Sequence, residues 1–300
     1  MNLKIYIMKT KIMKKAIILG LCTLLISCSK TTDEEINESQ TPITEKIFAF
    51  KYIDNGTNSV VQLNPNNGSE IKTIANLGNQ YLRIAKYYSN TDEILGEVNE
   101  NNTKKFYRIK VSDGTISKYN YNGYDDFVIG GNKLYAFKYN NSNNSIVELN
   151  PTNGTEITTL KSVGSNYLKN FVFSQTTNTI ICENNTTKSL YKINITNGNT
   201  ESFNYFGYDN LAISKNGQLY GFKYTTNNNQ IVELNTLNGN EIKTVKSMGS
   251  KYLKNMLYLN STAEIIGDLI DSSTHNYFKC KVSDGTSSEN SFGKYDYFIF

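Results

Sequence analysis

Apolar and polar residues alternate along the chain from Lys46 onward, in short runs that turn-forming residues interrupt. Two such runs are 180–183 (IICE) and 190–193 (LYKI), and clusters of Asn, Gly, Ser and Thr recur about every 8 to 12 residues. This period-two alternation is typical of half-buried β-strands, and no segment of helical length carries apolar residues at a 3.6-residue spacing. The pattern predicts an all-β domain.

One stretch of this pattern occurs three times. Its copies are residues 46–74 (KIFAFKYIDNGTNSVVQLNPNNGSEIKTI), 133–160 (KLYAFKYNNSNNSIVELNPTNGTEITTL) and 218–245 (QLYGFKYTTNNNQIVELNTLNGNEIKTV). Phe50, Phe137 and Phe222 hold equivalent positions and stand 87 and 85 residues apart. A period this regular marks a repeat architecture, in which every copy folds as the same supersecondary unit.

A second, related unit lies between the copies, and it begins at Tyr81, Tyr167 and Tyr252. Each repeat of about 86 residues therefore holds two modules of about 43 residues, the length of one four-stranded propeller blade. Every module has a hairpin turn before a short last strand, and these turns are Asn67-Gly68, Asp113-Gly114, Asn153-Gly154, Asn197-Gly198, Asn238-Gly239 and Asp284-Gly285. Three repeats predict a six-bladed β-propeller of four-stranded antiparallel blades.

The two ends of the repeated region complete each other. Residues 295–300 (YDYFIF) match 124–129 (YDDFVI) and 208–213 (YDNLAI), which are followed at once by a second strand. No second strand follows 295–300, and the matching segment is found instead at the start of the repeated region, at 46–50. We therefore expect one blade to take its innermost strand from 295–300 and its other three strands from 46–77, which closes the ring.

The first 27 residues are predicted to be an export signal. Five lysines precede an apolar run at 16–26 that is too short to remain as a membrane-spanning helix. The run ends in Leu-Ile-Ser-Cys28, which resembles the bacterial lipobox, and this resemblance implies that Cys28 becomes a lipidated N-terminus. An ordinary secretory signal that contains a cysteine is the alternative, and Met13 is an alternative start.

Residues 28–45 are polar and acidic and show no apolar periodicity. They are predicted to form a flexible tether that reaches at most about 60 Å before the propeller at 46–300 begins. Asp33-Glu34-Glu35 resembles the surface-export signal of Bacteroidota lipoproteins. We expect an outer-membrane lipoprotein, on the periplasmic side or the cell surface, whose diglyceride and palmitate chains bind the membrane.

The net charge argues against nucleic acid as a partner. The formal charge of +4 includes the five signal lysines. Without them the chain has 26 basic and 27 acidic side chains, a net charge of −1. Nucleic-acid binding needs a clustered basic surface, and a nearly neutral domain does not offer one.

The turn at 149–154 (LNPTNG) resembles the D-P-x-T-G turn of quinoprotein-like and YVTN-type β-propellers, with Asn150 in place of Asp. The resemblance covers 46–300 and implies the propeller fold. WD40 blades and pyrroloquinoline-quinone dehydrogenases both depend on Trp, and this chain contains none. We therefore expect no quinone and no other cofactor.

Residues that carry common catalytic chemistry are scarce. His275 is the single histidine, and we expect it to be a solvated residue of the polar turn 272–276, so no metal site is predicted. No nucleophile elbow, zinc-protease motif or phosphate-binding glycine loop occurs. Cys182 and Cys280 are predicted to be buried, unpaired residues of non-adjacent blades. No catalytic residue is predicted.

The starts of the innermost strands share one face of a propeller with several Asn- and Thr-rich loops. They place nine residues at the channel mouth: Tyr81, Arg83, Asp125, Tyr167, Lys169, Asp209, Tyr252, Lys254 and Asp296. These residues can form a mouth for a polar ligand, or the carboxylates can pair with neighbouring Arg, Lys and backbone N–H groups and lock the ring. Because the pattern repeats with the fold, we favour ring locking.

These inferences predict a lipid-anchored propeller of a Gram-negative envelope that acts as a non-catalytic binding or scaffolding module. Its ligand would be a glycan, a peptide or a protein at the upper mouth. The alternative is a lyase or hydrolase that uses carboxylates and tyrosines there. Active sites usually break internal symmetry, whereas these charged positions recur three times, so an enzyme is the less favoured hypothesis.

Overall fold

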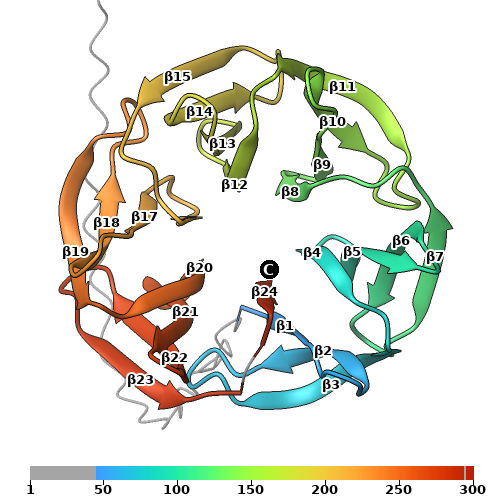
Figure 1. Cartoon of the computed structure of the whole chain (residues 1–300), viewed down its shortest axis with the longest axis horizontal. Helices are drawn as coiled ribbons and strands as arrows, with labels where there is room; N and C mark the ends of the chain where they lie inside the picture. The colour runs from blue at the N-terminus through green and yellow to red at the C-terminus, as the bar shows by residue number, and fades with distance from the viewer. Residues whose placement is uncertain (1–44, 294) are drawn as a thin grey trace, which may run out of the picture. The chain divides into compact units, whose positions relative to one another are not determined.

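Six four-stranded antiparallel sheets stand around a common axis in the computed structural model, which describes residues 45–293 and 295–300 (Figure 1). This arrangement confirms the predicted six-bladed β-propeller. The predicted signal (1–27) and all of the predicted tether except Glu45 lie outside the described residues. No helix in the described part of the chain is long and apolar enough to cross a membrane.

Each blade runs from an innermost strand beside the axis to an outermost strand at the rim. Blades 1, 3 and 5, innermost strand first, consist of β24 (Tyr297–Ile299), β1 (Ile47–Lys51), β2 (Asn58–Leu63) and β3 (Glu70–Gly78); β8 (Asp126–Gly130), β9 (Lys133–Lys138), β10 (Asn144–Leu149) and β11 (Glu156–Gly164); and β16 (Asn210–Ile213), β17 (Leu219–Lys223), β18 (Asn229–Leu234) and β19 (Glu241–Gly249).

The blades between them follow the same plan. Blades 2, 4 and 6 consist of β4 (Leu82–Tyr88), β5 (Glu93–Glu100), β6 (Thr103–Lys110) and β7 (Ile116–Asn120); β12 (Leu168–Ser174), β13 (Thr179–Asn184), β14 (Ser189–Asn194) and β15 (Thr200–Asn204); and β20 (Tyr252–Leu259), β21 (Glu264–Asp271), β22 (Thr274–Lys281) and β23 (Ser287–Ser291). We call the face where the innermost strands begin the upper face, and the opposite face the lower face.

The predicted closure is confirmed. β24 pairs antiparallel with β1, with Phe48 opposite Ile299 and Phe50 opposite Tyr297. The C-terminal end of the chain thus lies beside its first strand at the centre of the ring (Figure 1). Blade 1 is therefore built from both ends of the repeated region, as the sequence predicted.

The prediction of a short last strand is wrong for blades 1, 3 and 5. Their outermost strands β3, β11 and β19 each have nine residues. Each of them makes three register shifts against its neighbour. Because a bulge adds a residue to one strand and bends it, these long strands can curve along the rim.

The hydrophobic core is divided among the boundaries between neighbouring blades. At the boundary of blades 1 and 2, Phe48 and Phe50 pack with Leu82 and Ile94, and all four are fully buried. Five further clusters fill the other boundaries. Burying a side chain of this size stabilises the fold by roughly 1.5–3 kcal/mol. Each blade needs a neighbour on both faces, so stability depends on ring closure.

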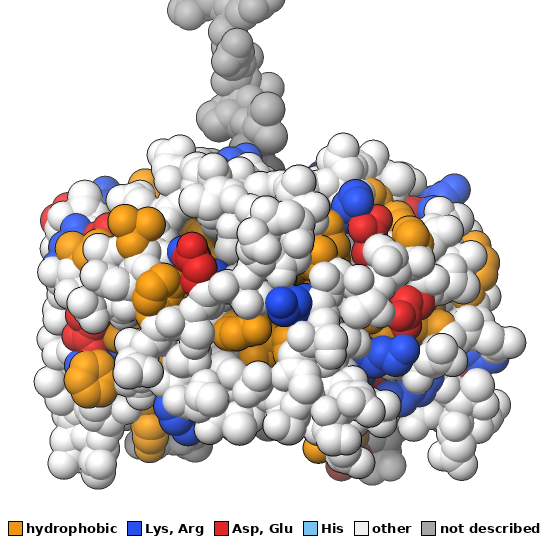
Figure 2. Space-filling model, turned by 90° about the horizontal axis from the view of Figure 1, so that it is seen from above, with side chains coloured by type: hydrophobic (Ala, Val, Ile, Leu, Met, Phe, Trp, Pro, Cys, Tyr) orange, Lys and Arg blue, Asp and Glu red, His pale blue; other side chains and the backbone are white. Residues whose placement is uncertain are grey.

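The rim itself is not a continuous apolar surface. Figure 2 shows one side of it, where hydrophobic side chains are scattered among polar and charged ones. Scattered apolar residues are ordinary on soluble surfaces. Two cavities lie within the channel.

Candidate functional site at the upper mouth of the channel

The structure places all nine predicted mouth residues where innermost strands begin. Three tyrosines stand at the starts of β4, β12 and β20, each with a basic residue two positions later, and three aspartates immediately precede β8, β16 and β24. They are, in chain order, Tyr81, Arg83, Asp125, Tyr167, Lys169, Asp209, Tyr252, Lys254 and Asp296. All nine keep some solvent exposure. The mouth is therefore a ring of alternating tyrosine and aspartate positions.

The backbone holds each aspartate in the same way. The N–H of Asp125 donates to the carbonyl oxygen of Phe137 at 2.9 Å, and Asp209 and Asp296 make equivalent bonds of 3.1 and 3.0 Å to the second strands of their blades. These bonds extend the pairing of each innermost strand by one residue. The carboxylates are thus presented from a rigid edge rather than from a loose loop.

Each aspartate lies beside a tyrosine of the next blade. Burial and a hydrogen bond to Asp296 raise the pKa of Tyr81 to about 12. Burial, with the charge of Asp209 and a hydrogen bond to it, raises the pKa of Tyr252 to about 12. Burial and the charge of Asp125 raise the pKa of Tyr167 as well. These hydroxyls therefore remain protonated at neutral pH.

Three further tyrosines, which the sequence analysis did not single out, complete the mouth. They are Tyr52, Tyr139 and Tyr224. Each packs edge-to-face on a tyrosine already named, in the pairs Tyr52–Tyr81, Tyr139–Tyr167 and Tyr224–Tyr252, with ring centroids 5.6, 5.6 and 5.7 Å apart. Tyr52, Tyr139 and Tyr224 are 45%, 50% and 59% exposed, respectively. The signal was a Phe-Lys-Tyr at the end of the second strand in every repeat. The Tyr is two residues after the buried Phe, so its side chain is on the same side of the strand as the Phe. It lies just beyond the end of the strand, where it is exposed.

Arg83 belongs to a buried network that joins blades 2 and 3. Its Nε donates to Glu97 Oε1 at 2.5 Å, and Glu97 is only 1% exposed. Glu97 also accepts from the backbone N–H of Tyr124 at 3.0 Å and from the Tyr121 hydroxyl, while the Arg83 guanidinium donates to the carbonyl oxygen of Tyr124. Asp125 stands 4.0 Å from the same guanidinium. The interactions that lock this boundary thus run mainly through Glu97.

The second repeat uses a related network. Lys169 Nζ lies 3.4 Å from the buried carboxylate of Glu183, and Asn170 Nδ2 donates to the carbonyl oxygen of Tyr208 at 2.9 Å. In the third repeat Asn255 Nδ2 donates to a carbonyl oxygen one residue further along, that of Asp296, at 3.3 Å. In the described part of the chain, Asp209 and Asp296 have no Lys or Arg within ion-pair distance. Their carboxylates interact instead with Tyr252 and Tyr81, respectively.

The structure corrects the expectation for His275. This residue is not in a solvated turn but in β22, where its Nδ1 lies 3.0 Å from both carboxylate oxygens of Asp268. Asp268 is 1% exposed and occupies the position of Glu97 and Glu183 in the third repeat. A buried carboxylate is stable only with partners, so the histidine has a structural role. The signal for these acids was a charged residue inside an otherwise apolar run in each repeat.

A polar cavity of about 370 Å³ continues below the mouth, within the channel. Its wall includes Asp126, which is followed in the next repeats by Asn210 and Tyr297 at the same position. Burial raises the pKa of the Asp126 carboxyl, and Asp125 adds to this, although Lys86 pulls the pKa down. The cavity wall therefore differs among the three repeats, whereas the residues of the upper mouth recur in each.

The described residues contain no group of three or more His, Cys, Asp or Glu side chains arranged to hold a metal ion. Cys182 and Cys280 are free and buried in non-adjacent blades. Burial raises the pKa of Cys280 to about 11, so its thiol is unreactive at neutral pH. The polar chemistry of the mouth thus rests on Tyr, Asp, Asn and Lys.

No known protein-family model matches the chain, and no curated protein matches it in sequence. TolB from Acinetobacter baumannii has a similar fold, with a TM-score of 0.65 and 11% identity; the match covers 85% of this chain and 65% of TolB. A putative 6-phosphogluconolactonase from Bacteroides fragilis aligns over 87% of this chain and 99% of its own, with a TM-score of 0.58 and 8% identity.

A third similar structure is the β-propeller domain of Swd1 from Myceliophteria thermophila. It has a TM-score of 0.53 and 9% identity, and the match covers 84% of this chain and 87% of that domain. Identities this low establish a shared fold and nothing finer. The chain is a β-propeller, similar to propellers of differing function.

Proposed function

We propose that this chain is a non-catalytic binding module whose upper mouth takes a neutral glycan. The observation that carries the proposal is the set of three exposed tyrosine pairs, each on a blade boundary with a carboxylate beside it. Tyrosine supplies a large, rigid, amphipathic contact at low entropic cost. Its ring packs against the C–H face of a sugar, while its hydroxyl and the carboxylate bond sugar hydroxyls.

The threefold repetition favours a ligand that itself repeats. Three equivalent weak sites on one rigid face can engage a polysaccharide together, so that overall affinity exceeds that of any one site. The charge favours a neutral polymer. Arg83 and Lys169 already face the buried acids Glu97 and Glu183, which leaves the half-buried carboxylates of Asp209 and Asp296 to repel a polyanion.

A lyase or hydrolase at this mouth is the less supported alternative. A general base works best with a pKa near the working pH, and the pKa values of Tyr81 and Tyr252 are raised to about 12. Such hydroxyls donate hydrogen bonds well but remove protons poorly. The mouth is better suited to holding a ligand than to transforming one.

The module is attached to the outer membrane by a lipid on Cys28, and faces either the periplasm or the cell exterior. Glu45, the first described residue, accepts hydrogen bonds from Asn260 and Ser261 at the turn after β20, on the lower face. The described part of the chain therefore begins on the face opposite the tyrosine pairs. Attachment at this end leaves the upper mouth free for a polymer.

Native electrophoresis in gels that contain xylan, laminarin or mannan tests the glycan proposal, with polygalacturonate as the anionic comparison. We expect at least one neutral polysaccharide to retard the wild-type domain, and the triple variant Tyr52→Ala, Tyr139→Ala, Tyr224→Ala to migrate freely with an unchanged melting temperature. Equal retardation of both proteins, or retardation by polygalacturonate alone, would contradict the proposal.

The anchor is tested separately by Cys28→Ser in the full-length precursor. We expect the variant to fold but to leave the detergent phase in a two-phase partition, because the acyl chains supply the membrane affinity. Partitioning identical to that of wild type would refute a lipid on Cys28 without bearing on the tyrosine pairs.

A further inference from the structure

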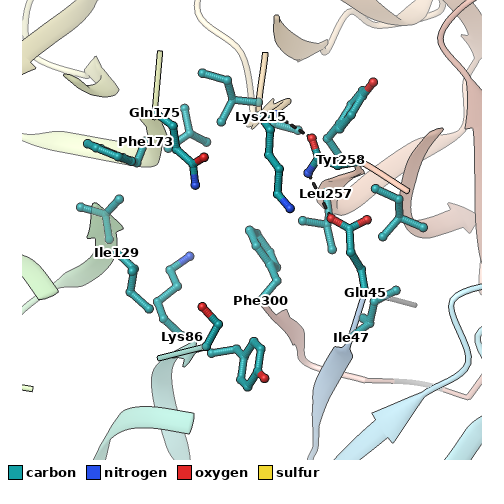
Figure 3. Close-up of a pocket in the computed structure, with 18 of the residues that line it drawn as sticks. Glu45, Ile47, Lys86, Ile129, Phe173, Gln175, Lys215, Leu257, Tyr258 and Phe300 are labelled. Atoms are coloured by element: carbon teal, nitrogen blue, oxygen red, sulfur yellow. Dashed lines mark hydrogen bonds between the residues drawn. The ribbon is translucent and has the colours of Figure 1, made fainter. Parts of the chain in front are cut away.

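The lower mouth of the channel opens into a second cavity, and its chemistry differs from that of the upper mouth. The cavity has a volume of about 490 Å³, within the range of roughly 300–1,000 Å³ that small-molecule sites occupy. Aliphatic and aromatic side chains dominate its wall, among them Ile129, Phe173 and Leu257 of the innermost strands and Phe300, which follows β24 (Figure 3).

Two lysines extend into this apolar space. Lys86 comes from β4 and Lys215 from the turn after β16, and Figure 3 shows both ammonium groups directed into the cavity from different sides. Neither has an ion-pair partner among the described residues. Lys46, also at this mouth, differs because its Nζ lies 2.6 Å from Asp92.

Phe300 lies between the two ammonium groups in this view (Figure 3). Lys86 Nζ stands 4.8 Å from the centre of the Phe300 ring, a cation–π distance. Lys86, Phe171 and Phe300 line both the upper and the lower cavity, so they mark where the two meet. Asp126, in the upper cavity, acts on Lys86 only through its longer-range charge.

The acidic group at the lower mouth is already engaged. Glu45 accepts from Asn260 Nδ2 at 3.1 Å and from the backbone N–H and the hydroxyl of Ser261 at 3.0 and 3.1 Å. Its charge is thus held at the edge of the cavity by three donors. The unpaired charge that remains inside is positive.

Neither lysine is required by the blade architecture. The equivalents of Lys86 in the other repeats are Val172 and Leu257. Lys215 stands in the turn 214–218, whereas the turn after β8 consists only of Gly131 and Asn132. Both lysines thus depart from the repeat, and both line the lower cavity. Folding does not require this coincidence, whereas a single ligand site explains it.

We propose that the lower cavity binds a small organic carboxylate with an apolar body, such as a medium-chain aliphatic acid. The carboxylate accepts charge-assisted hydrogen bonds from Lys86 and Lys215. The apolar body leaves water for the wall that Phe173, Leu257 and Phe300 provide. This site is separate from the tyrosine pairs and does not depend on the glycan proposal.

Isothermal titration of the whole domain with decanoate tests the site. Decyltrimethylammonium has the same tail and the opposite charge, and acetate has the charge without the tail, so neither should bind measurably. Lys86→Leu reproduces the residue that blade 6 carries natively, and Lys215→Gln changes an exposed turn. We expect each to weaken decanoate binding about tenfold or more, and the double variant to abolish it.

Lys46→Gln is the matched control, because this lysine belongs to the same mouth but is already paired. It should change the Kd by less than about threefold. Three results would overturn the proposal: no binding of decanoate at roughly millimolar concentration, equal binding of decyltrimethylammonium, or losses in Lys46→Gln as large as those in Lys86→Leu.

Discussion

The two mouths of the channel differ in how they relate to the internal repeat. The upper mouth carries the same elements three times, a tyrosine pair and an aspartate at every second blade boundary. The lower mouth carries two lysines that occur once each. Repetition suits a ligand with repeating units, whereas a single asymmetric pair of charges suits one small molecule.

Repetition alone does not separate structural residues from binding residues; burial does. Glu97, Glu183 and Asp268 recur, but each is 1% exposed and surrounded by partners. Tyr52 and Tyr139 also recur, yet each residue is about half exposed. The buried set locks the ring, and the exposed set is available to a ligand.

Removal of residues 295–300 should have the largest effect, since both mouths depend on a closed ring. The deletion exposes the edge of β1, leaves its backbone groups unpaired and opens the core that Ile299 shares with Phe48. We expect loss of the cooperative thermal transition. Removal of residues 1–44 is the control and should leave that transition nearly unchanged; equal melting of both truncations would disprove the closed ring.

Glu97→Gln should have the next largest effect. It leaves Arg83 and the N–H of Tyr124 around a neutral amide, and breaking a buried ion pair costs about 3–5 kcal/mol. Glu100→Gln, which breaks the exposed pair with Lys118, should cost below about 1 kcal/mol. Urea denaturation measures both, and similar costs for the two variants would show that Glu97 does not lock the ring.

Asp126→Asn should have a small effect of the opposite sign. Because burial raises the pKa of this carboxyl above its ordinary value of 3.8, its ionised form is disfavoured more in the folded than in the unfolded chain. Its contribution is therefore fully present below pH 3.8 and is lost as pH rises through the folded pKa. The variant, which copies Asn210, should be more stable at neutral pH by about 1 kcal/mol.

The reciprocal change, Asn210→Asp, sharpens this test. It places an acid at the equivalent position of blade 5 and should lower the melting temperature at neutral pH but not at low pH. If Asp126→Asn were less stable than wild type at neutral pH, the carboxylate would be held by the ring rather than disfavoured in the cavity.

The sequence predicted the ring closely because propeller geometry follows from the repeat. The period set the number of blades, and the match of 295–300 to 124–129 located the closing strand. It predicted the mouth in part. The positions at the strand starts were found. Tyr52 was missed because its exposure depends on where β1 ends. Lys86 was missed because the residues that line the lower cavity come from different repeats and meet only in the folded ring.

The proposed function requires three equivalent glycan sites at the upper mouth. Its most direct test compares the single variants Tyr52→Ala, Tyr139→Ala and Tyr224→Ala for retardation by the polysaccharide that retards wild type, with Leu237→Ala as an exposed apolar control on the lower face. We expect a similar partial loss of retardation in each single variant and no loss in the control. Complete loss in one variant, with wild-type behaviour in the other two, would contradict the proposal.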